Sequence, residues 1–471
     1  MSNYHFFYNL NRETLEARTE GFTNPDGYLL SIHRYSPQML GFAQNLAQNH
    51  QETILADNGY FERIRLLSNE FRAEANELFK QVKEQEKRIG HKAHRGDLSA
   101  DLTAKYQDLA KRIRSRVYEV EEQHLFPHVI SEQQKIEPHK RIVPEDILMA
   151  TLVGLNIEPA YSRLPRRFYA YRNKRSGRFY RYAKQGRYGD YVGEPYAVAS
   201  AVDYNSAFDA GRQMARDEVT HLAIGTGAFM ADNDYSDHYY MGQKKHVLER
   251  QVPRRYMRTV LTAKGLMDGY FSESKEYPKG IHFLGLGTPI MMLMTGWVCR
   301  EVEEVSFDAT SPIKDALEGT LYVTDPTYLK LRARSLAHWY LQNLDEEWQC
   351  QCSYCQHYYP QLPFQPEIAR AWLETQHEFP SKVTKEHLTE GGPLALAFPL
   401  FSEPRETEMR KTISKWRMGH NHLMLDRAMK LMNEPESDQE MRDRAEGIIK
   451  GYIERALPHF GYAIEHAWGL A

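Results

Sequence analysis

The segment HFLGLGTPIMMLMTGWVCREVEEVSFDAT, residues 282–310, contains two apolar runs on either side of a stretch with helical periodicity. The first run ends in Gly-Leu-Gly-Thr-Pro, and the second ends in Asp308. Two such runs joined by a helix are typical of parallel strands with a crossover connection. The segment therefore predicts a strand–helix–strand unit whose strand ends carry glycines and a carboxylate.

Apolar runs of the same kind recur along the chain. They lie at residues 53–59 (TILADNG), 147–155 (ILMATLVGL), 196–202 (YAVASAV), 221–227 (HLAIGTG), 282–288 (HFLGLGT) and 304–310 (EVSFDAT). Helical periodicity separates most of them, as in residues 206–217 and 289–301. So regular an alternation favours an α/β fold of the (β/α)8 TIM-like barrel type, with an open doubly wound sheet as the alternative.

Two segments interrupt this alternation. Residues 62–123 are highly charged with helical periodicity, and they predict a helical insertion near 62–140 that projects from the barrel. Residues 163–187 hold ten Lys or Arg residues and no acid, interleaved with Phe and Tyr. They predict a basic-aromatic insertion near 163–190.

The predicted domain organisation follows from these segments. We expect the barrel to span residues 1–345 and a zinc-binding subdomain to span 346–430. C-terminal helices over 431–471 are expected to pack back on the barrel.

The overall composition limits the class of protein. The net charge of −3 does not by itself indicate a polyanionic partner. Three of the four cysteines fall within six residues, so a disulfide framework is not expected, and a reducing, cytoplasmic compartment fits better. The polar N-terminus does not resemble a signal peptide, and the longest apolar stretch, near 287–298, is too short to span a bilayer. We therefore expect a cytoplasmic protein without a membrane partner.

The most specific motif is a cysteine knuckle, Cys350-Gln-Cys352-Ser-Tyr-Cys355. Thiolates at this spacing can point at one tetrahedral Zn²⁺, and a histidine usually completes such a set. The downstream candidates are His357, His377, His387, His420 and His422. Four protein ligands would leave no open position, so a structural zinc is expected. A reduced cysteine cluster without metal is the alternative.

Two aspartates directly follow apolar runs. Asp57 closes TILAD, and Asp308 closes EVSFD. An unpaired carboxylate is costly to bury, which makes a packing role poor for either residue. On one barrel rim the two could act as nucleophile and proton donor or acceptor, as in retaining glycoside chemistry. The alternative is that each Asp caps the helix that follows it.

Glycines also cluster at predicted strand ends. Gly225 and Gly227 end one run, and Gly285 and Gly287 end another. Their missing side chains allow the backbone to approach a flat ligand closely. A tight strand-to-helix turn would explain them equally well.

The basic-aromatic stretch is the candidate contact with nucleic acid. Basic side chains bind phosphates and aromatic rings stack on unpaired bases, whereas a solvated helix face is the alternative reading. The residues concerned are Arg166, Arg167, Arg172, Lys174, Arg175, Arg178 and Arg181.

Taken together, these motifs resemble the tRNA-guanine transglycosylase superfamily, in patches from about residue 54 to 432. The C-x-C-x-x-C knuckle matches, and His420-Asn421 matches the start of the family's zinc-ligand helix. The G-x-G-T-P strand end matches residues 285–289, and the family nucleophile matches Asp308. The family's D-S-G-G-F-Q turn is similar to residues 57–62, in which Asp57, Gly59 and Phe61 are kept.

The resemblance implies a set of roles. Asp308 would be the nucleophile, and Asp57 would bind the base and move its proton. The base would lie against Gly59, Phe61, Gly225, Gly227, Gly285 and Gly287. His420 is implied as the fourth zinc ligand, in preference to His422.

Departures from the tRNA-acting enzymes indicate a different branch. Residues 198–201 read Val-Ala-Ser-Ala in place of the family's V-Q-G-G, so its base-reading glutamine is missing. The two predicted insertions are also foreign to those enzymes. These features are similar to DNA transglycosylases, pentosyltransferases that exchange guanine in DNA for a 7-deazaguanine, here expected to be preQ0.

Two alternatives stay open: a tRNA-guanine transglycosylase, and a non-catalytic barrel that binds nucleic acid. The expected partners are DNA and the 7-deazaguanine base. Helper proteins that open the duplex and a homodimer are further possibilities implied by the resemblance.

Overall fold

The chain folds around a closed barrel of eight parallel strands, which are hydrogen-bonded in chain order with β8 beside β1. The computed structural model describes residues 3–32, 35–49, 52–91, 97–120, 126–145, 147–155, 157, 166–187, 193–201, 203–225, 254–323, 329–434 and 439–440. The barrel strands are β1 (Asn3–Asn9), β2 (Gly27–Leu30), β3 (Thr53–Ala56), β4 (Lys140–Ile142), β5 (Glu194–Ala199), β6 (His221–Gly225), β7 (Gly280–Leu284) and β8 (Glu304–Ala309). The predicted TIM-like barrel is confirmed, and the open sheet is excluded.

The barrel interior is filled by alternate side chains of the strands, as the two-residue period of a strand requires. A buried apolar cluster there consists of Phe7, Leu29, Leu55, Ile142, Tyr196, Val198 and Ala223. At the N-terminal ends of the strands, Lys140 of β4 forms an ion pair with Glu304 of β8. The Lys140 ammonium lies 5.5 Å from the centre of the Phe7 ring and 5.9 Å from that of Tyr196. These contacts fill space at the N-terminal end of the barrel interior, whereas barrel enzymes keep their functional groups at the C-terminal ends of the strands.

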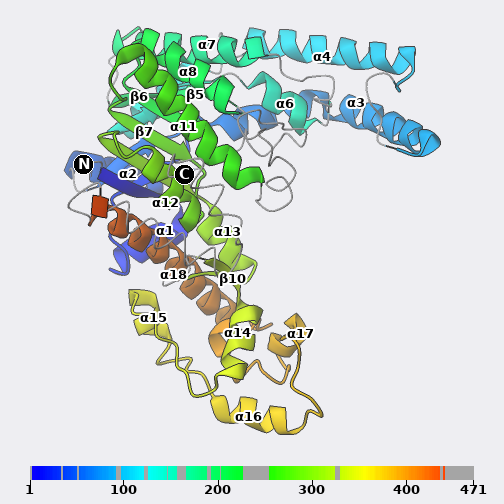
Figure 1. Cartoon of the computed structure of the whole chain (residues 1–471), viewed down its shortest axis with the longest axis vertical. Helices are drawn as coiled ribbons and strands as arrows, with labels where there is room; N and C mark the ends of the chain where they lie inside the picture. Colours follow the sequence, from blue (N-terminus) through cyan, green and yellow to red (C-terminus); the bar gives the residue numbers. More distant parts are fainter. Residues whose placement is uncertain are drawn as a thin grey trace.

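Helices follow most strands and surround the barrel (Figure 1). They are α1 (Arg12–Thr19), α2 (Pro37–Asn49), α5 (Phe126–Ile136), α6 (Leu148–Gly154), α7 (Arg166–Lys184), α8 (Tyr204–Arg216), α11 (Arg254–Ser274), α12 (Pro289–Val298) and α13 (Ser311–Leu317). Helices α8 and α11 pack with their backbones almost in contact. A Cβ at Gly269 would lie 2.0 Å from the carbonyl oxygen of Phe208, so only glycine fits there.

Two long helices after β3 extend away from the barrel as a pair (Figure 1). Helix α3 covers Tyr60–Ile89, and α4 covers Ala100–Val120. Their facing sides bury an apolar cluster that includes Leu78, Leu109 and Ile113. The helical pattern of charged and apolar residues in this segment thus forms two amphipathic helices, which stabilise each other through their apolar faces.

The chain beyond β8 builds a second core. It contains the antiparallel strands β9 (Thr320–Val323) and β10 (Leu329–Arg332), then α14 (Ala333–Gln342), α15 (Ser353–Tyr358), α16 (Pro366–Glu374), α17 (Lys385–Leu388), the 3₁₀ turn η4 (Pro399–Phe401) and α18 (Thr407–Asn433). Helix α18 returns to the barrel and contacts β1, α12 and α13. Of the predicted C-terminal helices over 431–471, only residues 431–434 and 439–440 are described.

The structure corrects two of the sequence-based element assignments. Residues 147–155 were predicted as a strand but form helix α6, because a short apolar run does not distinguish a buried strand from a buried helix. The strand at this point of the barrel is β4, whose sequence Lys-Arg-Ile carries no apolar run. The predicted basic-aromatic insertion is helix α7 from residue 166, packed against β5 and α8 as a regular barrel helix.

Among the described helices, none combines the length with the apolar character that crossing a bilayer requires.

Candidate functional site

Asp308 lies at the C-terminal end of β8, and its carboxylate is almost fully buried. Its Oδ1 accepts hydrogen bonds from the backbone N–H of Gly285 (3.0 Å) and from Nε2 of His282 (3.2 Å). Its Oδ2 accepts one from Nδ2 of Asn9 (3.2 Å). Strands β1, β7 and β8 thus fix this carboxylate together. Asp308 does not cap helix α13, which begins after Thr310.

Asp57 directly follows β3, and its Oδ1 accepts a hydrogen bond from the backbone N–H of Asn58 (2.7 Å). Loss of solvation raises the pKa of Asp57 from its ordinary 3.8 to about 7. The Asn58 N–H opposes this shift, while the negative charges of Asp308, Glu62 and Glu145 add to it. Asp57 does not cap helix α3 either, since Gly59 occupies that position with a left-handed φ of 64°.

Asp57 and Asp308 belong to the same rim of the barrel. All eight strands are parallel, so their C-terminal ends lie on one side. The electrostatic effect of Asp308 on the pKa of Asp57 shows that the two carboxylates are close enough to interact. The rim therefore carries one carboxyl group whose pKa is raised to about 7 and a second that accepts three hydrogen bonds.

The predicted ligand-binding glycines lie at the same rim. Gly225 ends β6, and Gly285, with a φ of 76°, follows β7 and donates to Asp308. Gly287 is explained by packing, because a Cβ there would lie 2.3 Å from the Cβ of Ala309. Gly227 and the side chain of Phe61 lie outside the described residues.

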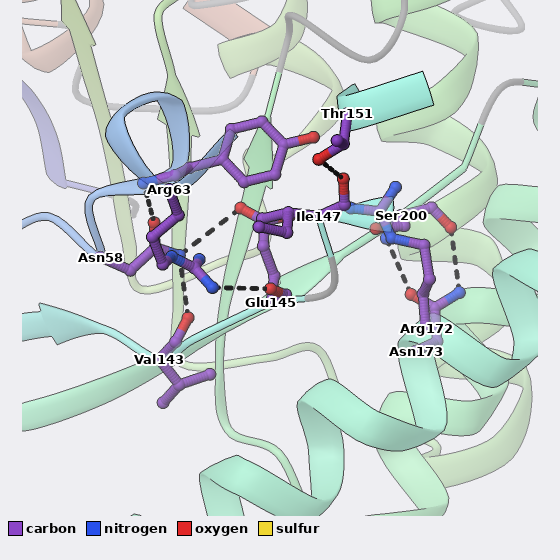
Figure 2. A network of polar contacts seen from close by, with 10 residues as sticks. Asn58, Arg63, Val143, Glu145, Ile147, Thr151, Arg172, Asn173 and Ser200 are labelled. Atoms are coloured by element: carbon purple, nitrogen blue, oxygen red, sulfur yellow. Dashed lines mark hydrogen bonds and ion pairs between the residues drawn. The ribbon is translucent and has the colours of Figure 1, made fainter. Parts of the chain in front are cut away.

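A buried polar network joins the ends of β3 and β4 to helices α3 and α7 (Figure 2). Asn58 Nδ2 donates to the carbonyl oxygen of Val143 (3.0 Å), and Arg63 Nη1 donates to that of Glu145 (3.2 Å). The Glu145 carboxylate pairs with Arg172 of α7 at 3.2 Å. Asn58 Nδ2 also lies 3.5 Å from Oε1 of this carboxylate, and a buried ion pair needs such additional hydrogen bonds to offset its desolvation.

The cations predicted to bind nucleic acid do not form one exposed face. Arg172 and Arg175 are 5% and 3% exposed, so they cannot reach a phosphate. Arg175 lies over the rings of Tyr118 and Phe126, at 5.5 and 5.2 Å. In this structure Arg175 packs α7 against α4 and α5, and Arg172 joins α7 to Glu145 after β4, which corrects the prediction for these two residues.

The other cations of the stretch differ in position. Arg181 pairs with Asp217 of the turn after α8, and Arg178 is half-buried. Lys174 is exposed. The side chains of Arg166 and Arg167 lie outside the described residues.

The cysteine knuckle and one histidine of α18 form a four-residue cluster. The ligand atoms of Cys350, Cys352, Cys355 and His420 all lie within 4.8 Å of one another. The His420 Nδ1 is 3.6, 3.5 and 3.4 Å from the three sulfur atoms in that order. Three sulfurs and one imidazole nitrogen around a common centre could bind a metal ion such as zinc.

Neighbouring groups fix the ligands of this cluster. His420 Nε2 is hydrogen-bonded to the carbonyl oxygen of Tyr322 (2.9 Å), so in the neutral ring Nε2 carries the proton and Nδ1, which is directed at the sulfurs, is the nitrogen that could bind a metal. The indole N–H groups of Trp348 and Trp416 lie 3.0 and 3.3 Å from Cys355 Sγ. Such donors stabilise a thiolate, so the surroundings fit a metal-binding set.

His422, the rival fourth ligand, is directed elsewhere. Its ring packs on Tyr8 at 4.5 Å, and its Nδ1 is hydrogen-bonded to the carbonyl oxygen of Met418 (2.8 Å). Burial lowers the pKa of His422 to about 4. Two residues apart on a helix, His420 and His422 face different sides, and only His420 faces the thiols.

Sequence reasoning missed three residues of the rim. His282 lies within the otherwise apolar strand β7, and a polar residue at such a position could have indicated a functional side chain. Asn9 ends β1, a strand that was not predicted because two Asn residues flank, and one His interrupts, its four aromatic residues. Glu145 follows β4, which was also missed, so its position at a strand end could not be recognised.

Comparison of the chain with the models of known protein families and with curated protein sequences gave no match.

Proposed function

We propose that this protein is a guanine transglycosylase that exchanges a guanine of DNA for a 7-deazaguanine such as preQ0. The observation that carries the proposal is the pair of carboxyl groups on one barrel rim, Asp308 held by three donors and Asp57 with its pKa near 7. Retaining glycosyl chemistry needs a fixed carboxylate as nucleophile and a second group that can take and return a proton near neutral pH.

In the proposed reaction, Asp308 attacks the anomeric carbon of the target nucleoside. A bond forms between its carboxylate oxygen and C1′ while the bond from C1′ to N9 of guanine breaks. The electron pair stays on the leaving base, which takes a proton from Asp57. The incoming 7-deazaguanine gives its N9 proton to Asp57 and displaces Asp308, so two inversions give net retention.

The cysteine–histidine cluster is assigned a structural Zn²⁺ in this proposal. With four protein ligands no position is open to substrate. The ion would hold α15 and the knuckle against α18, which itself packs on β1. It would take no part in the exchange.

DNA is proposed as the polymer because the chain departs from the tRNA-acting enzymes, as described above. The buried Arg172 and Arg175 add no support to this choice. The target base would leave the stack before it reaches the rim, at a cost of a few kcal/mol that single-stranded DNA largely avoids. Single-stranded substrate therefore also removes the need for a helper that opens the duplex.

The test is incorporation of labelled guanine into single-stranded DNA, duplex DNA and tRNA by the purified chain. Asp308→Asn keeps the size of the side chain but removes its nucleophilicity, and we expect it to abolish both exchange and the covalent protein–DNA adduct. Asp315→Asn is the matched control, because Asp315 lies in α13 and is bonded to Tyr322 and Lys330 instead of the rim. Incorporation of guanine by Asp308→Asn would overturn the proposal. Incorporation into tRNA but not into DNA would show that tRNA is the substrate.

A further inference from the structure

A line of polar side chains runs up the inside of the barrel on β7 and β8. Ser306 and Asp308 alternate on β8, and His282 lies beside them on β7, where it is paired in register with Ser306. His282 and Ser306 are 0% and 1% exposed. Barrel interiors are normally filled with bulky apolar residues, so a buried histidine and serine here require another explanation.

Both ring nitrogens of His282 are engaged. Nδ1 lies 2.9 Å from Oγ of Ser306, and Nε2 lies 3.2 Å from Oδ1 of Asp308. The ring also stacks on Phe7, with a centroid distance of 5.8 Å and an interplanar angle of 21°. The imidazole therefore has one orientation and no access to solvent.

The partners decide which nitrogen carries the proton. An ionised carboxylate can only accept a hydrogen bond, so Nε2 must donate to Asp308. In a neutral imidazole Nδ1 is then an acceptor, and the Ser306 hydroxyl donates to it. The direction of donation is therefore Ser306 to His282 to Asp308.

The two oxygens of Asp308 accept different numbers of hydrogen bonds. Oδ1 accepts from His282 and from the Gly285 N–H, which uses both of its lone pairs. Oδ2 accepts only the bond from Asn9 that the described residues provide, so one of its lone pairs is left for another partner.

We propose that His282, oriented by Ser306, is a positioning residue that holds Oδ1 of Asp308 so that Oδ2 is the atom that attacks C1′. The inference rests on the proposed transglycosylase function. The His282 proton stays on Nε2 in both displacements, and the C1′ ester forms and breaks at Oδ2 alone. His282 acts through Asp308 and does not touch the substrate.

The first experiment measures turnover of His282 variants on single-stranded DNA. In His282→Gln the amide N–H can replace the Nε2–H donor, whereas the shorter side chain of His282→Asn places its N–H near the position of Nδ1. Loss of one hydrogen bond to a charged group corresponds to about a ten- to hundred-fold lower kcat. We expect this loss in His282→Asn with an unchanged KM for DNA, and a smaller loss in His282→Gln. Ser306→Ala should fall between the wild type and His282→Asn.

A purely structural role predicts a different pattern, in which kcat follows the melting temperature of each variant. Equal kcat values for His282→Asn and wild type, or losses that track stability in all three variants, would overturn the inference.

The second experiment does not depend on activity. NMR of ¹⁵N-histidine-labelled protein reports the tautomer of His282, whose signal is assigned by its absence in His282→Gln. We expect the Nε2–H tautomer, with a changed signal in Asp308→Asn and in Ser306→Ala. An Nδ1–H tautomer in the wild type would contradict the inference, whether or not the protein exchanges bases. If the tautomer is found but no polymer accepts guanine, the proposed function fails and the orientation of Asp308 stands.

Discussion

Replacement of Asp57 by Asn should make the protein more stable at neutral and alkaline pH. The folded protein raises the pKa of Asp57 from 3.8 to about 7, mainly because the carboxylate loses solvation at the rim. The unfolded chain releases this proton near pH 4, so the folded state binds more protons between pH 4 and 7. Stability contributed by the protonated group is therefore complete below pH 4 and is lost as the pH rises to about 7.

The size of the effect follows from the shift. About three pKa units at ~1.4 kcal/mol each give an upper limit of about 4 kcal/mol. Because the Asp57 side chain keeps part of its surface exposed to water, we expect about half of this. Asp57→Asn should thus gain about 2 kcal/mol over wild type above pH 7 and nothing at pH 4, since Asn keeps the acceptor for the Asn58 N–H.

Urea unfolding followed by circular dichroism at several pH values between 4 and 9 measures this difference. Asp345→Asn, which removes the same charge from an exposed position, is the control for net charge. In an Asp308→Asn background the gain should be smaller, because one of the negative charges that raise the pKa of Asp57 is gone. A gain that is independent of pH, or the same in both backgrounds, would refute the account of the rim as two coupled carboxyl groups.

Two further predictions concern the metal cluster and the barrel helices. Purified protein should contain about one zinc ion per chain by elemental analysis. The variant His420→Ala should lose the zinc, whereas His422→Ala should keep it and lose only its ring contact with Tyr8. Equal zinc content in the two variants would contradict the ligand assignment. Gly269→Ala should lower the free energy of unfolding by about 3 kcal/mol, because α8 and α11 would have to move apart. Gly41→Ala in α2 has open space for a methyl group and should raise it by about 0.5–1 kcal/mol, so similar effects of the two changes would argue against the close helix contact.

The proposed function depends on which features of the rim belong to chemistry and which to packing. Gly287 and the buried cations of α7 have sufficient structural explanations, since they allow close contact or fill the space between helices. The Asp308 carboxylate fills no such space: it is a buried charge held by three hydrogen-bond donors, with one lone pair of Oδ2 left without a partner among the described residues. The proposed function therefore rests on Asp57 and Asp308.

The closure of the barrel was decided by the pairing of β1 with β8. The sequence by itself determined the strand–helix alternation, the cysteine knuckle and the two strand-end aspartates. These features are local, because an apolar run, a helical period or a C-x-C-x-x-C spacing is set by residues within a few positions of one another. Strand β4 and helix α6 were not predicted correctly. A short apolar run such as 147–155 can form either a buried strand or a buried helix, and the sequence Lys-Arg-Ile of β4 resembles a surface segment.

Only the tertiary structure decided the contacts between distant residues. His420 contacts thiols 65 to 70 positions away in the sequence, and His282 of β7 contacts Asp308 of the neighbouring strand β8. The same is true of Arg172 and Arg175. Their charge predicted an exposed surface, but on α7 they are buried, Arg172 against Glu145 and Arg175 against aromatic rings. The period of a helix tells which residues share a face, but the element that covers that face depends on the packing of the whole barrel.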